Sequence, residues 1–257
     1  MEFVDQLNRP VSLPHIPKRI ISLVPSQTEL LVDLGLRNKI VGVTKFCVHP
    51  VNLRASTTVV GGTKKVDFEK ITSLNPDVIL CNKEENTKEM VAQLEKIAPV
   101  WISDIENVLD TKSLITAFGD LFEVKAKAAQ INTEIDEEFK KHQSFVNSVT
   151  AKKVLYLIWK GPYMAAGKQT FIDSLLQLNK FENVISQNRG RYPEVKDEDF
   201  NQADVILLST EPYPFKKADA VLLSQKFKKE VKLVDGEYYS WYGSRLAKAF
   251  GYFKTLF

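Results

Sequence analysis

Short β-branched hydrophobic runs alternate with amphipathic segments along most of the chain. Residues 19–24 form one such run, which Pro25 closes, and residues 39–43 form the next. Between them, Ser26 and Glu29 have the spacing of a capping box, in which each side chain accepts a hydrogen bond from the other residue's backbone N–H group. A helix is therefore predicted from Ser26 to Gly35, and a strand, a helix and a strand in this order indicate a parallel α/β sheet.

The same order recurs further along the chain. A helix that begins at Asp67 leads into a strand within residues 75–80, and a helix that begins at Asp197 leads into a strand within residues 202–207. A helix predicted over residues 171–178 likewise follows a hydrophobic strand. The repetition indicates two related α/β halves.

Residues 108–147 differ from both halves because they hold no proline and carry apolar residues at helical spacing. A break near Gly119–Glu123 is predicted, followed by a second helix of about 25 residues. Such a segment is stiff, unlike a Gly/Ser-rich linker. The predicted organisation is an N-terminal lobe over residues 1–107, a helical segment over 108–148 that includes a rigid inter-lobe helix, and a C-terminal lobe over 149–257.

Composition narrows the class of protein. The 257 residues include 35 basic and 32 acidic side chains, for a formal net charge of +3, with no block of like charge that would indicate a nucleic-acid partner. No run of eighteen apolar residues occurs, and Met1–Pro17 do not resemble a secretory signal, so either a signal was removed or the protein is made without one. Cys47 and Cys81 are expected to be unbridged thiols.

The order of the motifs resembles a known family. The segment Ser22–Leu30, followed by Val41–Val43, Asn75–Ile79, a rigid helix and a second α/β lobe, is similar to the helical-backbone metal receptors. These are the cluster A, or class III, periplasmic substrate-binding proteins, which include the cobalamin-binding and ferric-siderophore-binding proteins of ABC importers. The resemblance implies two Rossmann-like lobes joined by a single long backbone helix, and a monomer without an intrinsic cofactor.

The function that the resemblance implies is binding of a metal chelate (a cobalamin or other corrinoid, haem or a ferric siderophore) in a cleft between the lobes. It further implies an extracytoplasmic location and a possible ABC permease partner, although a cytoplasmic location stays open without a signal peptide. The alternative is a cytosolic metal-chelate sensor or an enzyme on the same scaffold. No nucleophile elbow, phosphate-binding loop or zinc-protease motif supports an enzyme.

Candidate ligand-binding residues lie on the loops that follow predicted strands, where open α/β sheets bind their ligands. Flat aromatic rings suit a flat macrocycle or a catecholate, Cys47 and His49 are able to bind a metal, and Arg245 is able to hold a carboxylate. His49 is the candidate axial ligand to a chelated metal. The candidates are Pro25, Ser26, Cys47, His49, Trp159, Tyr163, Tyr192, Tyr213, Trp241, Tyr242 and Arg245.

Contact with a permease is expected through surface glutamates. In the family, one glutamate on each lobe docks onto arginines of the membrane partner, and the first position matches Glu69. The second position matches Ser240, which is not an acid, although Glu237 is nearby. This departure weakens the transporter part of the interpretation more than the ligand-binding part.

Overall fold

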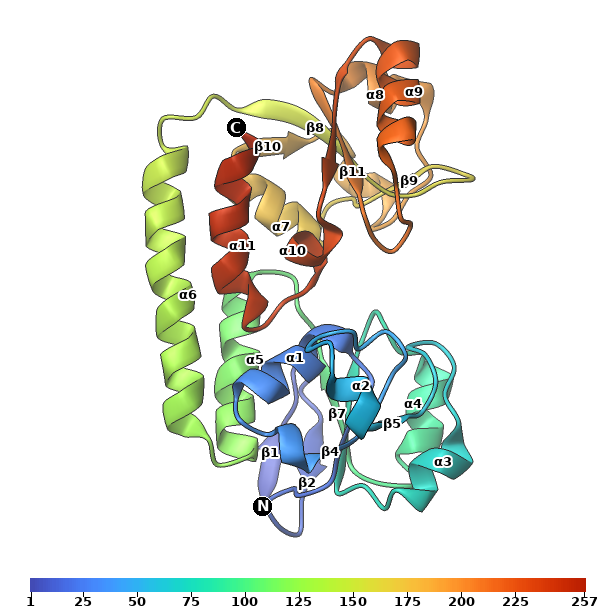
Figure 1. The fold of residues 1–257 in the computed structure, drawn as a ribbon, viewed down its shortest axis with the longest axis vertical. Helices are drawn as coiled ribbons and strands as arrows, with labels where there is room; N and C mark the ends of the chain where they lie inside the picture. Colours follow the sequence, from blue (N-terminus) through green and yellow to red (C-terminus); the bar gives the residue numbers. More distant parts are fainter. The chain divides into compact units, whose positions relative to one another are not determined.

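The chain folds into two compact units, each built on its own parallel sheet. The computed structural model describes residues 1–257 (Figure 1). Unit 1 comprises Met1–Ile105, Leu109–Ile135 and Tyr242–Arg245, and unit 2 comprises Glu106–Val108, Asp136–Trp241 and Leu246–Phe257. Parallel sheets with flanking helices in both units confirm the predicted α/β class.

The sheet of unit 1 has the strand order β5-β4-β3-β6-β7, with all neighbours parallel. Its strands are β3 (Ile20–Ser22), β4 (Ile40–Val43), β5 (Thr58–Val59), β6 (Val78–Asn82) and β7 (Val100–Ser103). A separate antiparallel pair is formed by β1 (Glu2–Val4) and β2 (Pro10–Ser12). Strands β3 and β6 are buried at every residue, as expected for central strands of a sheet covered on both faces.

Helices cover both faces of this sheet. On one face, Ile21, Ile79 and Val100 belong to the same hydrophobic cluster as residues of α3 and α4. On the other, Trp101 makes an edge contact with Phe118 of α5, at 6.1 Å between ring centroids. The helices that lie wholly or almost wholly in unit 1 are α1 (Pro25–Asp33), η1 (Arg37–Lys39), α2 (Leu53–Ser56), α3 (Phe68–Ser73), α4 (Lys88–Leu94) and α5 (Val108–Leu121).

One predicted helix start is wrong. Helix α1 begins at Pro25 and not at Ser26, and its N-cap residue Val24 has no side-chain cap. Proline is well suited to the first helical position for two reasons. A backbone N–H group at that position has no acceptor within the helix, so nothing is lost when proline lacks it, and the proline ring already fixes φ at a helical value. The Ser26–Glu29 capping box is therefore absent, and Glu29 has another partner, described below.

The chain passes from unit 1 to unit 2 in the long helix α6 (Lys125–Val146), whose residues up to Ile135 belong to unit 1. The predicted break between the two helices is confirmed: α5 ends at Leu121, and Glu123 has a positive φ of 55°. The second helix has 22 residues, close to the predicted length. None of the helices combines the length with the apolar composition that a membrane-spanning helix needs.

The sheet of unit 2 has the strand order β10-β8-β11-β12, again parallel, and the short strand β9 pairs antiparallel with β8. The strands are β8 (Lys152–Trp159), β9 (Met164–Ala165), β10 (Phe181–Asn183), β11 (Val205–Ser209) and β12 (Glu230–Val234). The helices are α7 (Phe171–Leu178), η2 (Gln187–Arg189), α8 (Asp197–Gln202), α9 (Lys217–Phe227), α10 (Gly236–Ser240), α11 (Arg245–Phe253) and η3 (Lys254–Leu256).

The two faces of this sheet are also packed. Leu155 and Ile206 share a cluster with Phe200 of α8 and Leu223 of α9. Tyr156 points to the other face, where its ring lies 4.9 Å from that of Tyr239. Alternate residues of one strand therefore enter two different cores, as the two-residue period of a strand requires.

Candidate functional site

Each sheet has a topological switch point, which is where ligands bind in open α/β folds. In unit 1 the chain proceeds from β3 to β4 and β5 on one side, and then to β6 and β7 on the other. In unit 2 it proceeds from β8 to β10 on one side, and then to β11 and β12 on the other. The switch points therefore lie beyond the carboxyl ends of β3 and β6, and beyond those of β8 and β11.

At the switch point of unit 1, buried polar side chains form a continuous hydrogen-bond network. Gln27 Nε2 donates to Ser103 Oγ at 2.5 Å and to the Tyr242 hydroxyl at 3.1 Å. Asn82 Nδ2 donates to Ser103 Oγ at 3.0 Å. Tyr242 is 6% exposed, and burial raises the pKa of its hydroxyl above the ordinary value. The Tyr242 hydroxyl thus lies at this switch point, between α1 and the end of β7.

Tyr242 belongs to a short segment near the end of the chain, Tyr242–Arg245, which we call the strap. The strap belongs to unit 1, although the residues on either side of it belong to unit 2. Arg245 donates from both Nε and Nη2 to the carboxylate of Glu29, each at 2.8 Å, and Ser244 donates to Asp33 at 2.6 Å. The guanidinium of Arg245 is therefore engaged by a protein carboxylate in a bidentate pair.

The other first-lobe candidates surround the same strand ends and are largely covered. Pro25 and Ser26 are buried in the first turn of α1. The Cys47 thiol is fully buried and lies 3.1 Å from Thr28 Oγ1 and 3.3 Å from Thr44 Oγ1. Burial raises the pKa of this thiol. The structure thus places Cys47 in a hydrogen-bonded interior position that holds its loop to α1.

His49 lies two residues further along the same loop and is half-buried. No group of three or more His, Cys, Asp and Glu side chains in the structure is arranged to hold a metal ion. The structure does not bring Cys47 and His49 into a protein metal centre. Contact of His49 with a metal that arrives inside a chelate stays a prediction.

The switch point of unit 2 carries one exposed aromatic ring, Trp159, and one half-buried ring, Tyr213. Trp159 is the last residue of β8 and is 42% exposed, and Tyr213 lies on the loop after β11. Their ring centroids are 5.7 Å apart at an interplanar angle of 70°. An edge-to-face pair at this distance is a favourable arrangement. Both residues are separate candidates in the sequence, and the structure brings them together.

Neighbouring contacts hold this aromatic pair in place. Tyr213 also packs edge-on against Phe215, at 4.8 Å between centroids, and Phe215 stacks with Tyr163 at 6.4 Å. Lys160, next to Trp159, donates to the Asp219 carboxylate at 2.5 Å. This hydrogen bond lowers the pKa of Asp219. The loop after β8 is thereby attached to the start of α9. Tyr163 packs against the hydrophobic cluster of unit 2 and stacks with Phe215, which in turn contacts Tyr213.

The remaining aromatic candidates of unit 2 have different surroundings. Tyr192 is 38% exposed, whereas Trp241 is only 7% exposed. The half-buried carboxyl group of Glu211 accepts a hydrogen bond from Ser240 Oγ, the residue before Trp241. Burial raises the pKa of Glu211, and the Ser240 hydrogen bond and the nearby Trp241 oppose the shift. Trp241 is therefore held inside unit 2, beside the carboxyl end of β11.

The candidate docking residue Glu69 has a different location. It is exposed in the first turn of α3, which the side chain of Asp67 caps. The hydroxyl of Ser240, the counterpart position in unit 2, lies within hydrogen-bond distance of the Glu211 carboxylate and of the Gly236 carbonyl, and it has one proton to donate to them. The Ser240 hydroxyl is thus engaged by acceptors of its own unit.

Residues 20–232 match the family model described as periplasmic binding protein. The chain is 27% identical over 194 residues to the ABC transporter substrate-binding lipoprotein YvrC of Bacillus subtilis, and the match covers 72% of this chain and 61% of YvrC. This chain therefore spans less than two thirds of that relative's length.

Solved structures agree over nearly the whole chain. The vitamin B12-binding protein BtuF of Vibrio cholerae superposes with a TM-score of 0.78 at 22% identity, covering 94% of this chain and 97% of BtuF. A periplasmic heme-binding protein of Pseudomonas aeruginosa gives a TM-score of 0.80 at 19% identity, covering 94% and 92% of the two chains. The family match spans well over half of the sequence, and the chain belongs to the periplasmic binding protein family, with the two-lobed α/β fold of its class III members.

Proposed function

We propose that this protein is the substrate-binding component of an ABC importer and that its substrate is a metal chelate of the corrinoid, haem or ferric-siderophore kind. Three observations support the substrate class: the family to which the chain belongs, the names of its relatives, and the aromatic rings at the switch point of unit 2. The observation that carries the proposal is the exposed Trp159 ring and its edge contact with Tyr213.

A flat chelate is well suited to this surface. An exposed indole gives a large apolar contact area with few rotatable bonds, so little conformational entropy is lost when a ligand covers it. The packing of Tyr213 against Phe215 and the Lys160–Asp219 ion pair fix the surroundings before any ligand arrives. Binding at Trp159 therefore relies on preorganised surface, which lowers the entropic cost of association. Tyr163 and Tyr192 are proposed as further contacts from the same unit.

Delivery to a permease is the second part of the proposal. Glu69 is exposed on α3 and has the surface position that a docking carboxylate requires. A rim carboxylate of this kind acts mainly on the association rate with a basic partner, through long-range attraction. Replacing Glu69 with Gln is expected to slow association with the permease in proteoliposomes and to leave chelate affinity unchanged.

The direct experiment is an absorbance titration of the whole chain with cyanocobalamin, haemin and a ferric catecholate, each in turn. At least one should bind stoichiometrically and shift its spectrum. A spectral change that is lost in the His49→Ala variant would add the imidazole to the ligands of the bound metal. If none of the three chelates binds by absorbance or calorimetry, the proposed substrate class is wrong.

A further inference from the structure

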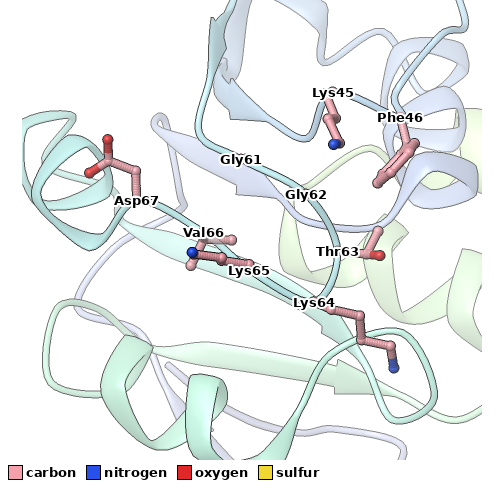
Figure 2. A pocket seen from close by; sticks show the side chains of 9 residues that line it. All are labelled: Lys45, Phe46, Gly61, Gly62, Thr63, Lys64, Lys65, Val66 and Asp67. Atoms are coloured by element: carbon pink, nitrogen blue, oxygen red, sulfur yellow. The ribbon is translucent and has the colours of Figure 1, made fainter.

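An open pocket of about 600 Å³ lies in unit 1, where the loops after β4 and β5 meet (Figure 2). Its size is within the range of small-molecule sites in proteins. The lining residues come from two short stretches of chain and are Lys45, Phe46, Gly61, Gly62, Thr63, Lys64, Lys65, Val66 and Asp67.

Backbone hydrogen bonds hold the two loops in place. Lys45 donates its N–H to the Gly61 carbonyl at 2.8 Å, and Gly62 donates to the Lys65 carbonyl at 2.7 Å. Gly61 has a φ of 128°, and a Cβ there would lie 2.6 Å from the Lys65 carbonyl oxygen, so only glycine fits this turn. The Thr63 carbonyl accepts a further hydrogen bond from Asn86 at 2.8 Å. The pocket walls are therefore preformed.

The lining has a net positive charge. Three lysines contribute to it, and the single carboxylate, Asp67, accepts a hydrogen bond from the Lys70 N–H group and caps α3. The Lys45 ammonium lies 5.0 Å from the centroid of the Phe46 ring, and Lys64 donates to the Glu84 backbone carbonyl. The Phe46 ring and the Glu84 carbonyl dipole compensate the charges of Lys45 and Lys64 only in part. An arriving anion would therefore be attracted to the pocket.

An apolar surface lies beside the charge. The Phe46 ring is 49% exposed, and Figure 2 shows it next to Gly62, with the Lys45 side chain extending toward the same stretch of backbone. A Cβ on Gly62 would lie 3.3 Å from Phe46 Cε2 and 3.7 Å from Lys45 Cε. The missing side chain at Gly62 thus leaves the edge of the ring and the lysine stem accessible from one direction.

We infer that this pocket binds an anionic, oxygen-rich part of the substrate, so that the chelate is one with carboxylate or catecholate groups rather than an uncharged corrinoid. The inference rests on the proposed function and names the substrate class more narrowly. Lysine ammonium groups act as compact point charges toward such oxygens, and the Phe46 ring provides contact for the carbon skeleton that carries them. Affinity should therefore fall as the salt concentration rises.

The test compares wild-type protein with two triple variants by calorimetry, using haemin, a ferric catecholate and cyanocobalamin as probes. The pocket variant is K45Q/K64Q/K65Q. The control is K39Q/K88Q/K96Q, which removes the same charge from lysines of unit 1 outside the pocket lining. A further variant, Gly62→Ala, narrows the pocket without changing charge. Thermal unfolding of each variant verifies folding.

We expect an anionic probe to bind more tightly than cyanocobalamin. Its affinity should fall about tenfold or more in the pocket variant, severalfold in Gly62→Ala, and less than twofold in the control. If an anionic probe binds and the pocket variant retains wild-type affinity, or if cyanocobalamin is the preferred probe, the inference is overturned and the proposed function stands. If no probe binds, the proposed function fails and the inference fails with it.

Discussion

The ion pair between Glu29 and Arg245 provides a sharp test of how the strap is held on unit 1. The side chains are 13% and 10% exposed, and two hydrogen bonds of 2.8 Å join them. Removing one partner of a fully buried pair costs about 3–5 kcal/mol, because the other charge is left without compensation. The remaining exposure of this pair reduces the expected cost to about 2–3 kcal/mol for Arg245→Ala.

The assay is differential scanning calorimetry of Glu29→Gln, Arg245→Ala and the double variant. For a protein of this size, 1 kcal/mol corresponds to about 2–4 °C in Tm, so Arg245→Ala should lower Tm by roughly 4–12 °C. The double variant should lower Tm by clearly less than the sum of the two single changes, because each single variant already loses the same interaction. Arg245→Lys should recover only part of the loss, since an ammonium group is unable to form the bidentate pair.

Two results would refute this reasoning. The first is a Tm change below about 1 °C in Arg245→Ala, which would show that the pair contributes no more than an exposed salt bridge. The second is strict additivity of the two single variants, which would show that the residues do not interact. Ser244→Ala is the matched comparison within the strap, because its bond to Asp33 is more exposed and should contribute less.

Two further predictions concern buried titratable groups. Burial, together with the charge of Lys254, lowers the pKa of His142, so the unfolded state binds more protons below about pH 6.5. The contribution of His142 to the free energy of unfolding should therefore be fully present above that pH and decrease as the pH falls below it. In urea titrations at acid pH, His142→Leu should reduce the dependence of the unfolding free energy on pH. An unchanged pH dependence would contradict the assignment. Burial also raises the pKa of Cys47 and of Cys81, so both thiols should react with a disulfide reagent only on unfolding. Rapid labelling of the native protein would contradict their placement.

Local sequence patterns predicted most of the secondary structure. The helix over residues 171–178 has the predicted bounds, and the unbridged state of both cysteines is confirmed. The predicted apolar face of the inter-lobe segment is buried, from Leu114 and Phe118 in α5 to Ile131 and Ile135 in α6. These features depend on hydrophobic periodicity and local chemistry, which a sequence displays directly. The start of α1 was the exception, because two local signals, Ser26 as cap and Pro25 at the first position, compete there.

The site was less predictable because its contacts join distant parts of the chain. Glu29 and Arg245 are 216 residues apart, and Gln27 and Tyr242 are 215 apart. No local signal indicates that a strap from the end of the chain would occupy a switch point in unit 1. Sequence spacing places Trp159 and Trp241 beside strand ends, but their exposures of 42% and 7% depend on which other segments cover them.

The measurement that tests the central proposal most directly is the affinity of the Trp159→Ala variant for whichever chelate the wild-type protein binds. The matched control is Phe68→Ala, which removes another exposed aromatic ring, at 37% exposure, from unit 1. Stacking of a nucleic-acid base on an aromatic side chain contributes about 1–3 kcal/mol. With the same magnitude for a flat chelate, we predict a loss of roughly ten- to a hundredfold for Trp159→Ala and no loss for Phe68→Ala. Equal affinity of the wild-type protein and a folded Trp159→Ala variant would contradict a binding site at the switch point of unit 2.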